Sequence, residues 1–141
     1  MECEFPTVNS NNKEILEILD SVHVIAIVGL SPDETKTSHR VAKFMQERGY
    51  KIVPVYPKEE TILGEKVYRS LEEIPFEIDM VDIFRKPKVF GAIADACIKR
   101  GDVKVFWGQL ELVNNEAAEK ARDAGMKVVQ NHCPKIELEN R

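Results

Sequence analysis

Positively charged side chains follow three of the apolar runs in this sequence, and together they would suit a phosphate. Lys36 and Arg40 lie in the polar segment after the first run, Lys58 follows a second run, and Arg85 and Lys86 follow a third. The whole chain carries a formal net charge of −4, so a cluster of cations would be a local exception. Taken alone, Lys58 is better explained as a solvated surface lysine, and the loop with Arg85 and Lys86 could equally be a solvated basic loop. Convergence of these cations on one edge would favour an anion site.

The segment from Gly29 to Arg40 could lead from a strand into a helix whose first amides face a phosphate. Gly29 permits a tight turn, and Thr37 or Ser38 is expected to cap the helix. The segment lacks the second and third glycines of the GxGxxG fingerprint, so the standard NAD motif is absent. On this segment alone, a phosphate site and an ordinary capped turn are equally good interpretations.

Two further positions could contact such a ligand. Lys58 stands close to where a NAD-binding domain has an acid for the ribose hydroxyl, and a lysine there favours a ribose phosphate, as in CoA or NADP. Gln109 follows a fourth apolar run and can both donate and accept hydrogen bonds. Trp107, two residues earlier, is expected in the core.

The sequence predicts no catalytic residue and no metal site, because it contains no Ser-His-Asp arrangement and no metal-ligand spacing. Three widely separated cysteines without a CxxC pair argue against a disulfide framework or a zinc site. His132 and Cys133 are neighbours on an extended stretch, so their side chains should point to opposite sides. Cys97 and Cys133 are expected to be buried; a disulfide between Cys133 and a bound thiol cofactor is the less favoured alternative.

Length and composition restrict the class of protein. The 141 residues fit one domain, which we expect over 11–141, after a flexible arm over 1–10. A pI near 5.5 argues against nucleic-acid binding. No apolar run approaches the roughly 20 residues that span a bilayer, and the acidic start is unlike a signal peptide. We therefore expect a cytoplasmic protein; a homo-oligomer or an unidentified protein partner is left open.

Helical and strand patterns alternate along the chain. Asn11, with Glu14 three residues later, should begin an N-terminal helix, and later helices should end at Gly49, Gly101 and Gly125. Strands are expected at 22–28, 51–55, 80–84, 103–107 and 126–129. This alternation predicts an α/β fold, a Rossmann-like doubly wound parallel sheet of about five strands with helices on both faces. The expected strand order is 3-2-1-4-5, with a ligand crevice between the first and fourth strands.

Several short motifs, in the right order over about residues 22–138, resemble those of the CoA-binding domain family of small stand-alone proteins. This family is similar in fold to the N-terminal CoA-binding domain of the succinyl-CoA synthetase alpha subunit. The motifs are Val28-Gly29-Leu30-Ser31-Pro32, Ser38-His39-Arg40-Val41-Ala42, Gly49-Tyr50-Lys51-Ile52-Val53-Pro54-Val55, Leu63-Gly64-Glu65-Lys66-Val67-Tyr68, Val81-Asp82-Ile83-Phe84-Arg85, Trp107-Gly108-Gln109-Leu110, Asn115-Glu116-Ala117-Ala118 and Cys133-Pro134-Lys135-Ile136-Glu137.

The resemblance implies that coenzyme A, or an acyl-CoA, lies across the tips of the strands. The implied contacts are Gly29, Leu30, Ser31, Pro32, Ser38, Arg40, Val55, Tyr56, Pro57, Lys58, Phe84, Arg85, Lys86, Pro87 and Gln109. Two residues depart from the family pattern: Glu111 stands where a glycine is usual, and Tyr56 where many members have asparagine. The synthetases carry a phosphorylated histidine on a second domain that this sequence does not contain, so we expect a carrier, sensor or regulatory binding module without its own catalysis.

Two other functions remain open at this point. The basic loops would also suit an NADP-dependent oxidoreductase or another nucleotide-binding protein, although the missing glycines and the missing proton donor weigh against it. Glu111 would also be compatible with an interaction module that has lost its ligand.

Overall fold

Five apolar segments lie side by side as a parallel sheet in the computed structural model, which describes residues 5–140. Their valine and isoleucine side chains are buried on both faces, as in the central strands of α/β proteins. The predicted α/β class, with its Rossmann-like parallel sheet, is confirmed. The strands are β1 (Val24–Val28), β2 (Lys51–Val55), β5 (Met80–Ile83), β6 (Val105–Gly108) and β7 (Lys127–Val129).

The strand order across the sheet is β2-β1-β5-β6-β7, so the predicted order 3-2-1-4-5 is wrong. β5, the third of these strands along the chain, pairs with β1 instead of with β2. Pro54 supplies a physical reason. Gly29 N donates to Val55 O and Tyr68 N donates to Pro54 O, so alternate residues of β2 face β1 and the outer edge. The missing N–H of Pro54 faces outward, which is tolerated only in an edge strand.

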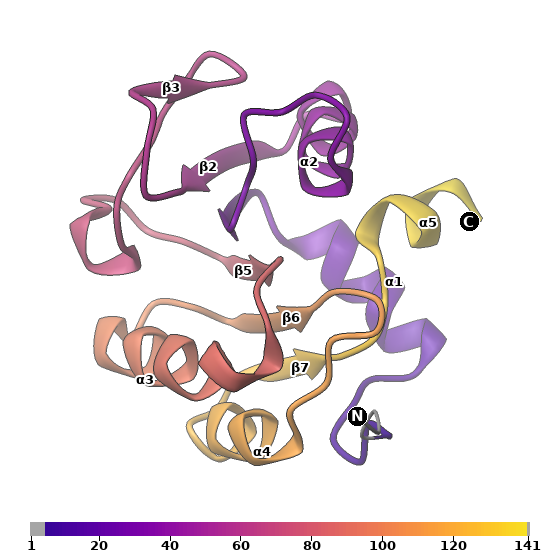
Figure 1. The fold of residues 1–141 in the computed structure, drawn as a ribbon. Helices are drawn as coiled ribbons and strands as arrows, with labels where there is room; N and C mark the ends of the chain where they lie inside the picture. Colours follow the sequence, from indigo (N-terminus) through magenta and orange to yellow (C-terminus); the bar gives the residue numbers. More distant parts are fainter. Residues whose placement is uncertain (1–4, 141) are drawn as a thin grey trace.

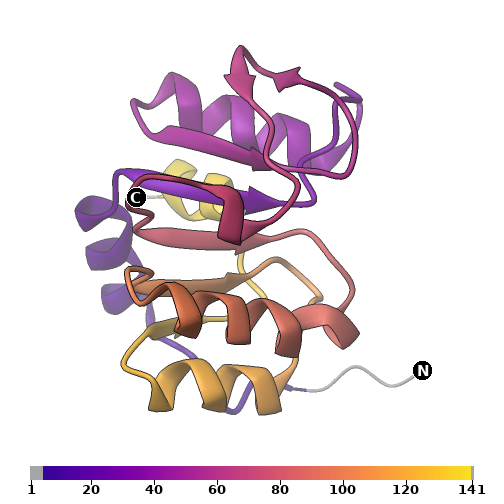
Figure 2. The same ribbon diagram turned by 90° about the vertical axis from the view of Figure 1, so that its left-hand side faces the viewer.

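Helices cover the two faces of the sheet in separate groups (Figure 1). α1 (Asn12–Ser21), α2 (Thr37–Glu47) and α5 (Pro134–Glu139) pack on one face. α3 (Phe90–Arg100) and α4 (Asn115–Asp123) pack on the other, and they lie in front of the sheet in the turned view of Figure 2. None of the helices within residues 5–140 is long and apolar enough to cross a membrane.

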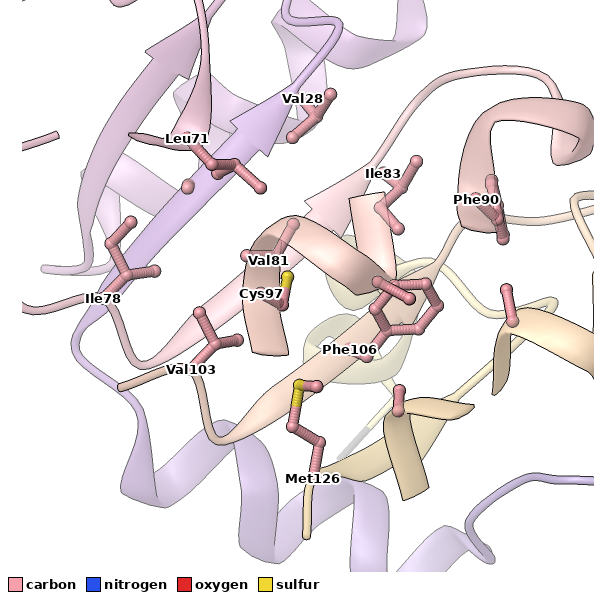
Figure 3. Packing of buried hydrophobic residues seen from close by; sticks show 14 of the residues in the cluster. Val28, Leu71, Ile78, Val81, Ile83, Phe90, Cys97, Val103, Phe106 and Met126 are labelled. Carbon is pink, nitrogen blue, oxygen red and sulfur yellow. The ribbon is translucent and has the colours of Figure 1, made fainter. Parts of the chain in front are cut away.

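Alternate strand residues supply the two halves of the core. On the α3 and α4 side, Val81 and Phe106 pack with Phe90 and Cys97 of α3 (Figure 3). The Phe90 and Phe106 rings meet edge to face, with centroids 6.0 Å apart. On the other side, Trp107 packs with residues of α1, α2 and α5. Trp107 is fully buried, as expected from the sequence.

Two small elements interrupt the long link between β2 and β5. Strands β3 (Thr61–Ile62) and β4 (Glu65–Lys66) form a hairpin, and η1 (Leu71–Glu73) is a single 3₁₀ turn. Gln46 of α2 donates to Leu63 O at 2.9 Å and so fastens the hairpin to the domain. The sequence analysis missed the hairpin and α5, because each is too short to show a periodic pattern.

The N-terminal segment lies along β7, the second edge of the sheet. Asn9 Nδ2 donates to Gln130 O at 3.0 Å, and Gln130 N donates to Asn9 Oδ1 at 2.9 Å. Ser10 Oγ donates to Val128 O at 2.7 Å, and Val8 is buried. The sequence predicted a flexible arm over 1–10. Residues 1–4, which include Cys3, lie outside the described residues, and residues 5–10 lie against the sheet.

Candidate functional site

A pocket of about 480 Å³ opens at the carboxyl ends of β1, β2 and β5. In the observed strand order the chain reverses direction between β1 and β5, and ligands of open α/β sheets bind at such a switch point. The pocket therefore lies where the first, second and third strands along the chain end, not between the first and fourth strands as predicted. The lining residues are Val28, Gly29, Val55, Tyr56, Pro57, Arg69, Phe84 and Arg85.

Gly29 brings the backbone of the first loop into contact with the end of β5. Its φ is +88°, and a Cβ at this position would lie 2.7 Å from Phe84 O and 3.1 Å from Arg85 Cδ. Gly29 N donates to Val55 O at 2.9 Å, while Phe84 N donates to Val28 O at 2.8 Å. These bonds tie the three strand ends together at the floor of the pocket, so only glycine fits here.

The first loop folds back on itself before α2 begins. Ser31 N donates to Ser38 Oγ at 3.0 Å, and the ring nitrogen Nδ1 of His39 lies 2.9 Å from Ser31 O. Ser38 and His39 are accordingly buried, and Leu30 is fully buried beneath them. Two predicted contact residues, Leu30 and Ser38, thus serve the loop itself in this structure. Their contact with a ligand stays a prediction.

The first turn of α2 contains Arg40 and begins without a side-chain cap from the described part of the chain. Among residues 5–140, no side chain caps this helix and no acidic residue lies in its first turn. Lys36, not the expected Thr37 or Ser38, is the N-cap residue, because the hydroxyl of Ser38 is already used by Ser31. By contrast α1 has the predicted Asn11–Glu14 capping box, and Asn114 caps α4. Free amides at a helix start favour an anion.

The predicted cations follow strand ends at the carboxyl edge of the sheet, and Arg40, Lys58, Arg85 and Lys86 are all exposed. Arg85 lines the pocket. Arg40 lies in the first turn of α2, Lys58 after β2 and Lys86 after β5, and these three are not among the residues that line it. Ser31, Pro32 and Pro87 are half-buried in the adjoining loops. Ligand binding by the predicted set of residues stays a prediction.

Arg69 lines the pocket and escaped the sequence analysis. Its Nη1 donates to Tyr56 O at 3.0 Å and to Lys58 O at 2.8 Å, across the loop that follows β2. Tyr68, its neighbour, forms an isolated bridge with Val55 at the outer edge of β2. Local sequence gives no sign of this contact, since Arg69 lies in a link for which we expected no sheet pairing.

Gln109, the residue after β6, lies inside the domain rather than on its surface. It is buried, and with its amide nitrogen turned toward Asp82, Nε2 lies 2.8 Å from Oδ1 and 3.2 Å from Oδ2. Asp82 sits between Ile27 and Trp107 in the register of the sheet. Burial raises the pKa of Asp82 well above its usual value, outweighing the lowering by the Ile83 backbone donor. Sequence analysis assigned no role to Asp82.

Glu111 has the backbone conformation that explains the glycine usual at its position. Its φ is +66°, in the left-handed region, and its amide donates to Asn131 Oδ1 at 2.7 Å. Glycine adopts this conformation without strain, whereas a side chain costs about 1–2 kcal/mol. The difference between Glu111 and the usual glycine therefore concerns the backbone conformation at this position.

The side chains of Cys97, Cys133 and His132 are buried or paired with other residues of the fold. Cys97 and Cys133 are both buried, as expected, and burial raises the pKa of the Cys97 thiol to about 12. His132 Nδ1 lies 2.6 Å from Glu137 Oε1 at the start of α5. Within residues 5–140, no three His, Cys, Asp or Glu side chains gather as a metal ion would need.

Comparison with known proteins identifies the family. The model of the CoA binding domain matches residues 23–139. YneT of Bacillus subtilis is 41% identical over 128 residues, which cover 91% of this chain and 94% of YneT. A solved structure from Pyrococcus horikoshii OT3 is 40% identical with a TM-score of 0.89, and the match covers 99% of this chain and 98% of that one.

A larger protein contains a similar domain. The alpha subunit of the ADP-forming acetate–CoA ligase II from Pyrococcus furiosus is 30% identical over 119 residues. The match covers 77% of this chain and 26% of that subunit, so the chain corresponds to about a quarter of it. The family match, the parallel sheet and the resemblance seen in the motifs agree: this chain belongs to the CoA-binding domain family.

Proposed function

We propose that this protein binds coenzyme A or an acyl-CoA in the pocket at the carboxyl ends of β1, β2 and β5, as a carrier, sensor or regulatory module. The observation that carries the proposal is the pocket itself, which is lined by two arginines, Arg69 and Arg85. Family membership supports the same ligand. The proposal does not include catalysis by this chain or binding of any other ligand.

The chemistry of CoA matches the charges around this pocket. CoA carries a ribose phosphate and a diphosphate, both of which are recognised by guanidinium groups and by helix amides. Arg85 and Arg69 line the pocket, and α2, which follows the loop after β1, has the positive end of its helix dipole at its first turn. An overall acidic chain that places two arginines at one pocket favours an anionic ligand there.

Calorimetry and thermal shift on the purified protein would test this function. We expect heat and a raised melting temperature with CoA, because a ligand at about 100 times its Kd stabilises the folded state by roughly 2.7 kcal/mol. Acetyl-CoA would distinguish a carrier of acyl groups from a binder of free CoA, and NADPH is the control for a different nucleotide. Absence of both signals at millimolar CoA, or a preference for NADPH, would overturn the proposal.

Mass spectrometry of the natively purified protein is the complementary measurement. A retained CoA thioester would name the acyl group directly. The cytoplasmic location and any homo-oligomer or protein partner stay predictions from the sequence.

A further inference from the structure

Arg69, one of the two arginines that line the pocket, is exposed and makes hydrogen bonds through both its backbone and its side chain. Its backbone amide donates to Glu73 Oε2 at 2.8 Å, which anchors it to η1. Tyr68, just before it, exchanges backbone hydrogen bonds of 3.0 Å with Pro54 and Tyr56. The position of Arg69 is therefore set by β2 and η1 together.

The guanidinium of Arg69 uses only one of its nitrogens within the described chain. Nη1 donates to the carbonyls of Tyr56 and Lys58, and so closes the loop after β2 into the wall of the pocket. Nε and Nη2 have no hydrogen-bond acceptor among residues 5–140. A guanidinium presents five donors in a rigid fork, so two nitrogens remain for a planar or tetrahedral anion.

Arg85 faces the same pocket from the end of β5. Its Cδ lies 3.1 Å from the position of a Cβ on Gly29, so its stem passes directly over the loop after β1. The pocket thus has an arginine on the β2 side and an arginine on the β5 side. Gly29 lets the stem of Arg85 and the end of β5 pack closely on the loop after β1.

We propose that Arg69 is a positioning and specificity-determining residue of the pocket: Nη1 holds the loop after β2, and Nε with Nη2 binds a phosphate of the ligand opposite Arg85. The inference rests on the proposed CoA function and extends it to a residue that the sequence analysis did not single out. It predicts that affinity for phosphate-bearing ligands depends on Arg69, beyond any effect on the shape of the loop.

Calorimetric titration of three ligands separates these two effects. CoA carries three phosphate groups, 3′-dephospho-CoA lacks the ribose phosphate, and pantetheine has none. We expect Arg69→Gln to weaken CoA binding about tenfold or more, as for the loss of a charge-assisted hydrogen bond. Pantetheine binding should change much less. Arg69→Lys keeps the charge but not the fork, so its CoA affinity should fall between those of wild type and Arg69→Gln.

Arg122→Gln is the matched control, because Arg122 is an exposed arginine at the far end of α4 whose partner is the neighbouring Asp123. CoA affinity equal in Arg69→Gln, Arg122→Gln and wild type would overturn the role of Arg69 and leave the CoA function intact. An equal loss for CoA and pantetheine would reduce Arg69 to a support of the loop and overturn phosphate binding. Absence of CoA binding by wild type would overturn the proposed function and this inference together.

Discussion

Gly29 shows how one missing Cβ can control both packing and access to a pocket. Gly29→Ala would place a methyl group 2.7 Å from Phe84 O, a backbone atom held by the sheet, at a φ of +88°. We expect a loss of about 2–4 kcal/mol in unfolding free energy, from the clash and the left-handed φ together. Urea denaturation measures the loss, and CoA binding by the folded fraction should also weaken.

Gly125→Ala is the control for the φ contribution alone. Gly125 has a φ of +97°, and no described atom lies within 4 Å of its missing Cβ. This variant should lose only about 1–2 kcal/mol. Equal losses in the two variants would show that the close contact with β5 adds nothing.

Glu111 gives the opposite prediction, a stabilising substitution. Glu111→Gly removes the strain of a side chain at a φ of +66° and keeps the backbone donor to Asn131. The greater freedom of glycine in the unfolded chain offsets part of the gain, so we expect about 0.5–1 kcal/mol of added stability. Thermal unfolding measures it.

Glu111→Ala separates the backbone effect from the charge. It removes the carboxylate but leaves a Cβ in the left-handed conformation, so it should not stabilise the protein. If Glu111→Ala stabilised as much as Glu111→Gly, charge rather than conformation would be responsible.

The N-terminal segment protects an edge strand that would otherwise expose hydrogen-bonding groups. Asn9→Ala removes both bonds to the backbone of Gln130, a residue that is fully buried. An unsatisfied buried amide costs about 1–3 kcal/mol, so we expect a loss of that size. Faster hydrogen exchange at the Gln130 amide would locate the loss at β7.

Thr7→Ala serves as the comparison for this segment. Thr7 contributes its backbone amide, which donates to Asn115 Oδ1 at 2.8 Å, and a substitution at its side chain leaves that bond in place. Stability should stay within about 0.5 kcal/mol of wild type. An Asn9→Ala variant as stable as Thr7→Ala would contradict a role for the segment in covering the edge.

Elements with strong local signals were predictable from the sequence, and their lateral arrangement was not. The capping box at Asn11 and the buried valine runs depend on neighbours within a few residues, so α1 and all five sheet strands were recognised. Strand order depends on which strand edges pair, and only Pro54 gave local information about it. A proline within a strand is typical of an edge strand. Pro54 therefore indicates that β2 lies at the edge of the sheet, which puts the switch point beside β1.

The residues of the candidate site also differ in whether local sequence or long-range pairing places them. Gly29 and Arg85 follow strand ends directly, so sequence reasoning brought them to the rim where the pocket lies. Arg69 reaches the pocket through a bridge between Tyr68 and Val55, a pairing between segments with no periodic pattern of their own. Asp82 looked like an ordinary strand residue, since only the packed sheet puts Ile27 and Trp107 on either side of it.

Burial of Asp82 in the centre of the sheet connects one proton to the stability of the whole molecule. Its pKa is raised by burial well above the usual 3.8, so the folded protein keeps a proton that the unfolded chain releases. Between 3.8 and the raised pKa, the folded state binds more protons, and the unfolding free energy must therefore fall as pH rises. The slope contributed by this group approaches about 1.4 kcal/mol per pH unit.

Asp82→Asn should remove this slope, because asparagine has no proton to lose and can still accept a hydrogen bond from Gln109. We expect the variant to gain stability relative to wild type as pH rises, measured by urea denaturation at intervals from about pH 5 upward. Taking the difference between the two proteins cancels the histidines and the surface carboxylates, which titrate alike in both. Asp123→Asn, at an exposed side chain, should leave the wild-type slope unchanged. Parallel pH profiles for wild type and Asp82→Asn would mean that Asp82 is ionised in the folded protein, and that its charge is compensated inside the sheet.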